Sequence, residues 1–299
     1  MTQAQVIVTP IVQKRRRPSL GGRWPVHLAV IGLVVLWLLP TVGLLVNSVR
    51  SSQAVSSSGW WTAIFPPYDF TLGNYVQVLN QQNLGQAFIN SFIITVPVMI
   101  IVIAFASFAA YAFAWMDFPF KNVLFVIMVG LLVVPLQTTL IPVTQLFRAV
   151  NINGTPLGPF LGVWIAHVGY GLPFAIYLMR NFMGGLPREV FESASIDGAS
   201  SSTAFFRLAL PMSVPAIAAL AIFQFLWVWN DLLVALIFIG PVPANQPLTQ
   251  VVSSLVSSRG LGWEYLTAAA FITMIVPLVV FFALQRYFVR GITGGAVKG

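Results

Sequence analysis

Long apolar runs separated by short polar segments dominate the hydrophobic pattern of this chain. A helix needs about 20 apolar residues to cross the hydrocarbon core of a bilayer, and six runs are long enough to do so. These runs cover residues 24–49, 87–115, 122–147, 159–179, 214–240 and 266–288. The pattern predicts an all-α polytopic membrane protein with six transmembrane helices.

Residues 186–211 form the one long polar interruption in the second half of the chain. Glu189 suits the first turn of a short helix, where an acid complements the helix dipole, and Asp197-Gly198 predicts the end of that helix. The serines that follow can cap a second short helix over residues 203–210. Two short helices joined by a tight turn form either an exposed knob that another protein binds or an amphipathic segment on the membrane surface.

The spacing within this loop resembles the EAA loop of permease subunits from binding-protein-dependent ABC importers. The matching positions are Glu192-Ser193-Ala194, Gly198, Leu208 and Leu210-Pro211. Ser193 and Leu208 depart slightly from the family, which has Ala and often Ile there. In that family the loop is a coupling helix that docks into a cleft on a cytoplasmic ATPase subunit. The resemblance implies ATPase coupling through Glu189, Glu192, Ser193, Ala194, Asp197, Gly198, Ala199, Leu210 and Pro211.

The end of the chain carries a second resemblance. Residues 285–299, QRYFVRGITGGAVKG, resemble the terminal segment of carbohydrate-importer permeases. In maltose-type members this tail enters the interface between the two ATPase subunits. The resemblance implies the same role for Gly294, Gly295, Ala296, Val297 and Lys298. Without a partner, residues 291–299 are predicted to be disordered, because they are rich in glycine and terminal.

Composition agrees with a membrane protein: 58% of the residues are hydrophobic and 7% are charged. The mean hydropathy is +0.88, whereas soluble domains have about a quarter of their residues charged. The absence of cysteine excludes a disulfide framework and thiolate chemistry. The net charge of +8 is spread over the ends of the apolar runs rather than collected on one face, so no nucleic-acid partner is predicted.

Twelve of the 15 Lys and Arg residues fall on one side of the predicted spans, and only Arg50, Arg148 and Arg259 fall on the other. Basic residues concentrate on the cytoplasmic side, so both termini and the 186–211 loop are predicted to be cytoplasmic. A cleaved signal peptide is the alternative for the first run, although that run exceeds the usual apolar length of about 7–15 residues. The predicted domains are a basic tail, a six-span permease domain and a C-terminal tail, over residues 1–23, 24–290 and 291–299.

Asn230 and Asp231 are polar residues inside the fifth predicted span. An acid at membrane depth is costly, so it should face protein or water. Asp231 is therefore either a translocation-path or gating residue or the acceptor of a helix-packing hydrogen bond. Together with Trp229 these residues resemble a segment common in sugar permeases. His167 has no second histidine and no carboxylate at ligand spacing, so no metal site is predicted.

Two outer segments add to the resemblance. Residues 70–75, FTLGNY, resemble the F-T-L-x-N-Y segment of carbohydrate permeases. In maltose-type members the last outer loop reaches toward the sugar pocket of the binding protein, which implies such a contact for Ser257, Arg259 and Gly260. A solvated connector is the alternative.

The combined resemblance identifies the chain as one of two different permease subunits of a carbohydrate ABC importer of the maltose type, with a type I importer permease fold. It implies a bacterial cytoplasmic (inner) membrane location, a second homologous permease in a heterodimer, two cytoplasmic ATPase subunits and an extracytoplasmic sugar-binding protein. The chain has no GxxxxGK[ST] phosphate loop, so ATP and Mg are expected on the ATPase subunits and no cofactor in this chain. The resemblance also assigns the direct membrane sugar site to the other permease.

The substrate is less defined by the sequence. The region from 151 to 187 is most similar to the α-glucoside and glucosylglycerol branch, which suggests an α-glucoside-type di- or oligosaccharide. An ABC importer of a non-sugar solute is the alternative, because the EAA-like loop is shared across the superfamily. A membrane-embedded enzyme and a secondary transporter are disfavoured, since the chain shows no HExxH or GxSxG motif and no visible inverted repeat.

Overall fold

The computed structural model describes residues 24–81, 83–255 and 262–296, and these divide at Leu44 into two compact units. The described residues are helical apart from turns and one isolated bridge between Arg50 and Phe70. In chain order the α-helices are α1 (Trp24–Ser48), α2 (Ser52–Ser57), α3 (Gly73–Gln81), α4 (Leu84–Trp115), α5 (Lys121–Leu131), α6 (Leu136–Ala149), α7 (Pro159–Met183), α8 (Arg188–Ile196), α9 (Ser201–Ala204), α10 (Leu210–Met212), α11 (Val214–Trp229), α12 (Leu233–Phe238), α13 (Leu248–Ser253) and α14 (Trp263–Ala296).

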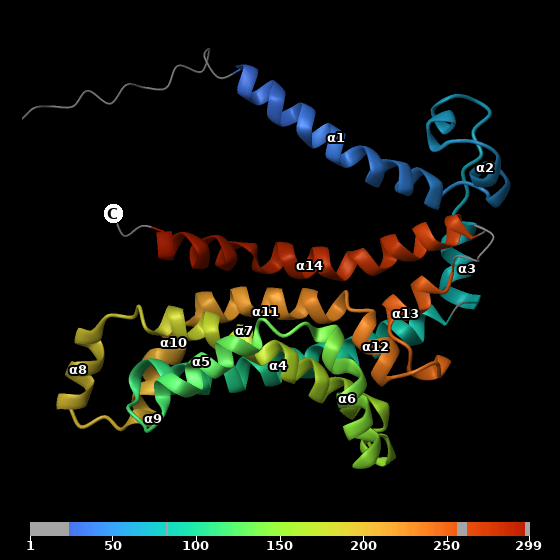
Figure 1. Ribbon diagram of the computed structural model, residues 1–299. Helices are drawn as coiled ribbons and strands as arrows, with labels where there is room; N and C mark the ends of the chain where they lie inside the picture. Colours follow the sequence, from blue (N-terminus) through green and yellow to red (C-terminus); the bar gives the residue numbers. More distant parts are fainter. Residues whose placement is uncertain (1–23, 82, 256–261, 297–299) are drawn as a thin grey trace, which may run out of the picture. The chain divides into compact units, whose positions relative to one another are not determined.

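The core of the second unit is built from α4, α7, α11 and α14. Helix α4 packs against α7 and α11, and α11 packs in turn against α14 (Figure 1). Small side chains such as Ala106, Ala110 and Ala175 are fully buried in this core. Small residues let membrane helices approach closely, which explains why an all-apolar sequence can still specify one arrangement of helices.

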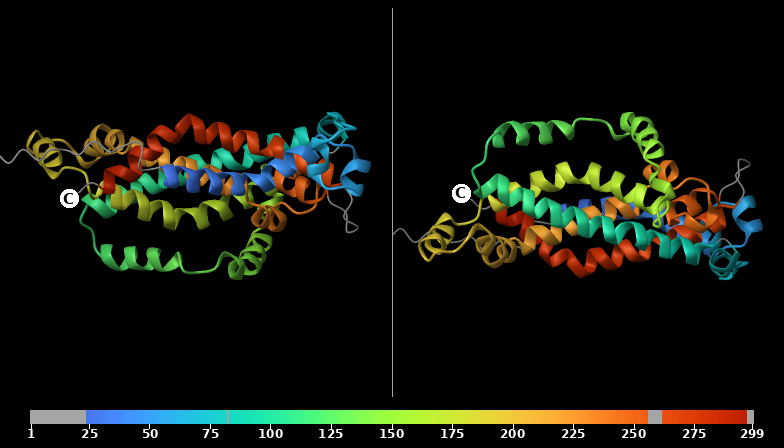
Figure 2. Two further views of the ribbon diagram at one scale, coloured as in Figure 1. Left: turned by 90° about the horizontal axis from the view of Figure 1, so that it is seen from above. Right: turned by 90° about the horizontal axis from the view of Figure 1, so that it is seen from below.

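Four described helices are long and apolar enough to cross a membrane, namely α1, α4, α7 and α14. Six spans are reached if each of two bent helix pairs counts as one span. The predicted span over residues 122–147 is bent, because α5 and α6 meet at an angle of 102°. Pro135 precedes α6 and lacks the N–H that a continuing helix would use. Figure 2 shows α5 and α6 arching along one side of the core.

The fifth predicted helix, residues 214–240, is also interrupted. Helix α11 ends at Trp229, and α12 restarts at Leu233 after a short break that contains Asp231. On the other side of α11, the segment Ser201–Met212 joins it at an angle of 70°. Residues 214–240 therefore form two helical pieces, α11 and α12, and Asp231 lies at the break between them.

The last helix is longer than predicted. Helix α14 continues through Ala296 and contains Pro277. The predicted disorder is therefore wrong for residues 291–296, whose backbone is helical. Val297 and Lys298 lie outside the described residues. The glycines of this segment lower its helix propensity without preventing a helix that α14 already nucleates.

Candidate functional sites: the loop at 186–211 and the helix break at Asp231

The first predicted helix of the loop is present as α8, which projects beyond the ends of the core helices (Figure 1). Pro187 stands at its N-cap, and Glu189 lies in the first turn as predicted. Proline suits this place because a helix start needs no N–H donor from it, and its fixed φ favours the entry.

The turn after α8 is a Schellman motif. Gly198 has a φ of +80°, the left-handed conformation that the sequence predicted for it. The N–H of Ala199 donates to Ala194 O at 2.9 Å, and the N–H of Gly198 donates to Ser195 O at 3.1 Å. These are the two hydrogen bonds that define this helix ending. A Cβ on Gly198 would meet no atom within 4 Å, so the requirement for glycine comes from the backbone conformation.

Gly198→Val is therefore expected to weaken coupling, because the left-handed conformation costs a non-glycine residue about 1–2 kcal/mol. We expect a lower substrate-stimulated ATPase rate in the assembled importer and an unchanged yield of the complex. Gly198→Asn is the matched control, because asparagine tolerates the left-handed conformation and should retain most of the rate. A normal ATPase rate for Gly198→Val would show that coupling does not depend on the left-handed turn.

The second half of the loop consists of three short helical pieces. Ser200 Oγ accepts a hydrogen bond from the N–H of Thr203 at 3.2 Å, so Ser200 caps α9 as the sequence suggested. A π-helical turn, Phe205–Ala209, follows and leads into α10. The predicted helix over 203–210 thus begins two residues earlier and extends past Pro211, which is tolerated because it stands at the start of α10.

Aromatic contacts attach this loop to the core. Phe191 of α8 is buried and stacks on Trp115 of α4, with ring centroids 4.0 Å apart. Trp115 Nε1 donates to Met183 O at 3.0 Å, which fixes the indole. Phe205 is buried against Phe108, with ring centroids 4.8 Å apart. These contacts hold both halves of the loop against α4, and they could not be predicted because the partners are distant along the chain.

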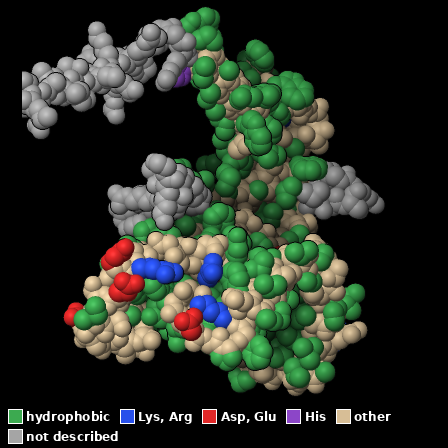
Figure 3. Space-filling view, turned by 60° about the vertical axis from the view of Figure 1, so that its left-hand side comes forward, with side chains coloured by type: hydrophobic (Ala, Val, Ile, Leu, Met, Phe, Trp, Pro, Cys, Tyr) green, Lys and Arg blue, Asp and Glu red, His purple; other side chains and the backbone are tan. Residues whose placement is uncertain are grey.

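The outer face of the loop carries the predicted coupling residues. Figure 3 shows acidic and basic side chains gathered at this end of the molecule. Within the part of the chain that the structure describes, none of the acids of the loop forms an ion pair. Ile196 at the end of α8 is 87% exposed. Of the predicted positions, the exposed ones are Glu189, Glu192, Ser193, Asp197, Gly198 and Pro211, and the half-buried ones are Ala194, Ala199 and Leu210.

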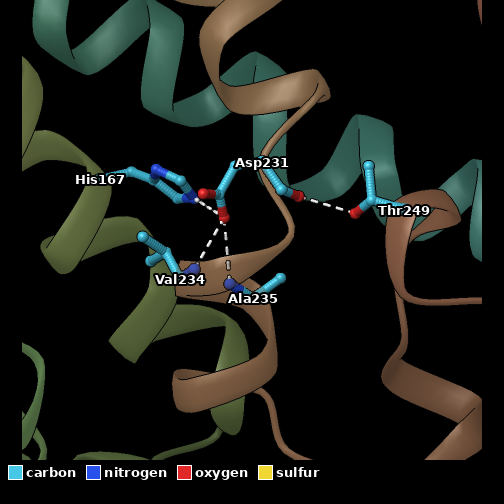
Figure 4. Close-up of polar contacts among 5 residues, drawn as sticks. All are labelled: His167, Asp231, Val234, Ala235 and Thr249. Atoms are coloured by element: carbon cyan, nitrogen blue, oxygen red, sulfur yellow. Dashed lines mark hydrogen bonds and ion pairs between the residues drawn. The ribbon is translucent and has the colours of Figure 1, made fainter. Parts of the chain in front are cut away.

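The helix break between α11 and α12 is organised by the carboxylate of Asp231 (Figure 4). Asp231 Oδ2 accepts hydrogen bonds from the N–H groups of Val234 at 3.0 Å and Ala235 at 3.1 Å. It therefore satisfies donors that an uninterrupted helix would have paired internally. Asn230 belongs to the other side of the break, where its Nδ2 donates to Leu226 O at 2.8 Å.

The same break is tied to α7 and α13. His167 of α7 is 1% exposed, and its Nε2 lies 3.6 Å from Asp231 Oδ2. Thr249 Oγ1 of α13 donates to Asp231 O at 2.7 Å. All these contacts lie within the chain, so the geometry favours the packing interpretation of Asp231 over a translocation-path role. Among the described residues no cluster of three metal-ligating side chains occurs.

The F-T-L-x-N-Y resemblance falls on a structural contact. Asn74 is buried, and its Nδ2 donates to Ser48 O at 2.9 Å and to Arg50 O at 2.8 Å. Tyr75 Oη is 2.8 Å from Ser48 Oγ. The segment thus holds the end of α1 against the start of α3. The predicted binding-protein contacts, Ser257, Arg259 and Gly260, lie outside the described residues.

Comparison with known proteins decides the family. Residues 87–294 match the family described as binding-protein-dependent transport system inner membrane component. The chain belongs to this family. It is an integral membrane permease of an ABC importer that depends on a binding protein, and it is not an enzyme.

Relatives and solved structures agree with this assignment. The osmoprotective compounds uptake permease protein GgtD of Synechocystis sp. is 52% identical, over 95% of each chain. The alpha-glucoside transport system permease protein AglG of Rhizobium meliloti is 41% identical, covering 92% of this permease and 97% of the relative. A chain of a bacterial ABC transporter involved in alginate import has the same fold, with a TM-score of 0.71 at 20% identity over 88% of this permease and 95% of that chain.

Proposed function

We propose that this permease is one of two different permease subunits of a carbohydrate ABC importer in a bacterial cytoplasmic membrane. It forms half of the translocation path for a neutral sugar of the α-glucoside class. The observation that carries the coupling part of this proposal is the projecting α8 loop, whose Schellman turn and aromatic contacts hold exposed acids away from the core.

The loop supplies a surface for an ATPase subunit. Its acids have no ion-pair partner among the described residues, so basic or hydrogen-bond-donating groups of another protein can bind them. Ile196 adds an exposed apolar side chain beside them, the combination of apolar contact and charge that protein interfaces use. The distribution of basic residues supports a cytoplasmic location for this loop, where ATP is available. In this proposal ATP and Mg are bound by the two ATPase subunits, and residues 294–298 are the candidate contact with the interface between them.

The substrate class rests on the relatives. AglG is named for α-glucoside transport and GgtD for osmoprotective compounds. A small neutral glucoside is compatible with both names, because neutral sugars such as sucrose also act as osmolytes. An extracytoplasmic binding protein delivers the sugar, and a second permease completes the path. Uptake of a non-sugar osmolyte is the alternative that the name of GgtD leaves open.

The test is uptake by the reconstituted importer with its binding protein. We expect ATP-dependent uptake of a disaccharide α-glucoside or of glucosylglycerol, and no uptake when the ATPase subunits are omitted. Glycine betaine serves as the non-sugar osmolyte at the same concentration. Uptake of betaine alone would overturn the carbohydrate assignment and leave the permease family unaffected.

A further inference from the structure

A cavity of about 280 Å³ between α7 and α11 combines aromatic rings with one amide. Its lining residues are Tyr170, Gly171, Phe174, Phe223, Gln224 and Trp227. Each helix contributes positions i, i+1 and i+4, which share one helix face. An adjoining cavity of about 430 Å³ at the bend between α5 and α6 shares Tyr170 and Trp227 with the first. The two together are within the size range of small-molecule sites.

Gln224 is the polar group of the smaller cavity. Its side chain is 3% exposed, and its amide Nε2 is buried without a hydrogen-bond partner in the part of the chain that the structure describes. A buried donor without a partner costs about 1–3 kcal/mol, which a membrane protein tolerates where a partner from outside the chain satisfies it. Gly171 makes room for the amide, because a Cβ there would lie 2.8 Å from Gln224 Nε2.

The rings of the cavity are held in defined positions. Phe174 and Phe223 meet edge to face, with centroids 6.3 Å apart, and Trp227 meets His167 in the same way at 5.4 Å. Tyr170 Oη accepts a hydrogen bond from Thr139 Oγ1 at 2.9 Å. Phe174 is 42% exposed and Trp227 is 39% exposed, so part of each ring remains open. The cavity is thus an aromatic surface beside an amide nitrogen that has no hydrogen-bond partner among the described residues.

This chemistry suits a sugar ring. None of the six residues that line the smaller cavity is charged, so it favours a neutral ligand. A pyranose has an apolar C–H face that packs on an aromatic ring and hydroxyl groups at its rim that accept a hydrogen bond from an amide. We propose that this cavity binds one pyranose unit of the transported sugar, with Trp227 under the ring and Gln224 Nε2 donating to a hydroxyl.

The proposal rests on the proposed function and goes beyond it, because it gives this permease a sugar contact of its own. The family resemblance alone assigns the direct membrane sugar site to the other permease. The competing source of a partner for Gln224 is a polar group of that second permease. A sugar hydroxyl and a polar group of the second permease could each accept the same hydrogen bond from Gln224, and the experiment distinguishes them.

The experiment uses the full importer in nanodiscs, with a labelled α-glucoside supplied on the binding protein and the complex trapped with ATP and vanadate. We measure the sugar retained per complex, the uptake rate, the basal ATPase rate and the amount of second permease that co-purifies. Gln224→Leu and Trp227→Ala are expected to lower sugar retention and uptake about tenfold, the effect of losing one hydrogen bond or one ring contact. Basal ATPase and co-purification should be unchanged.

Two further variants serve as controls. Trp227→Phe keeps an aromatic ring and is expected to retain most of the binding. A purely structural role of Trp227 would instead lower the amount of assembled complex in Trp227→Ala and leave sugar retention per assembled complex unchanged. Phe282→Leu alters an exposed ring of α14 that lines neither cavity, and should behave as the unaltered importer. Gln224→Leu removes a polar group from an apolar site, so it should fold at least as well as the native chain.

Three outcomes overturn an assignment. If the unaltered importer takes up no sugar, the proposed function itself fails. If it takes up sugar and Gln224→Leu retains and transports it normally, the pyranose site is wrong and the function stands. If Gln224→Leu loses the second permease while uptake per assembled complex is normal, the amide pairs with that subunit rather than with sugar.

Discussion

Asp231→Leu is expected to reduce the recovery of folded permease from membranes by at least tenfold. The carboxylate accepts hydrogen bonds from Val234 and Ala235 and lies beside buried His167, so leucine leaves those donors without an acceptor. Each buried unpaired donor costs about 1–3 kcal/mol, and about 1.4 kcal/mol corresponds to a tenfold change in an equilibrium. Because native proteins are stable by only about 5–15 kcal/mol, the combined loss is large. Size-exclusion chromatography and the thermal midpoint of the purified complex measure it.

Asp231→Asn separates the two interpretations of this residue. Asparagine keeps an oxygen that can accept from the α12 N–H groups, and it removes the negative charge that faces His167. We expect near-native folding and near-native transport, since the geometry favours a packing role. If Asp231→Asn folds normally and transports nothing, the charge acts in the translocation path and the packing interpretation is wrong. A native thermal midpoint for Asp231→Leu would show that the helix break does not depend on the carboxylate.

Hydropathy predicted the positions of the apolar segments well. It did not predict which of these segments form straight helices. A window of about 20 residues measures the free energy of transfer into lipid, which depends little on backbone direction. The 102° bend between α5 and α6 lies inside one such apolar run. Pro135 was a visible signal for that bend, but proline is common in membrane helices and many of them continue through it, as α4 does at Pro97.

Local capping was predictable because its signals are contiguous. The left-handed turn at Gly198 and the cap at Ser200 each depend on a few neighbouring residues, and both are present. The contacts that position the functional regions were not predictable, because they join distant parts of the chain. His167 meets Asp231 across two helices, although no carboxylate stands near His167 in the sequence. The position of Gln224 beside Gly171 could likewise be seen only in the structure.

Phe191→Ala is expected to uncouple the importer while leaving its membrane core folded. The ring of Phe191 is 8% exposed and stacks on Trp115 at 4.0 Å, so it is a principal attachment of α8 to α4. Truncation of a buried phenylalanine to alanine costs about 3–5 kcal/mol. Most of this loss should weaken the attachment of the loop to α4. In the proposed function α8 is the link to the ATPase subunit, so movement of its surface relative to the core should break that link. Substrate-stimulated ATPase activity should therefore fall by at least tenfold, a change equivalent to about 1.4 kcal/mol.

Phe191→Leu and the double variant with Trp115→Ala test whether the stack itself is responsible. Leucine keeps apolar bulk without a ring, so an intermediate ATPase rate is expected. If the two rings act through each other, Trp115→Ala added to Phe191→Ala should cause little further loss, because neighbouring residues are not additive. Ser195→Ala serves as a comparison on the same helix, since its side chain is exposed and cannot hold α8 to the core. Normal stimulation in Phe191→Ala would show that the loop keeps its position without the aromatic contact. Additive losses in the double variant would show that Trp115 acts through its hydrogen bond to Met183 O instead.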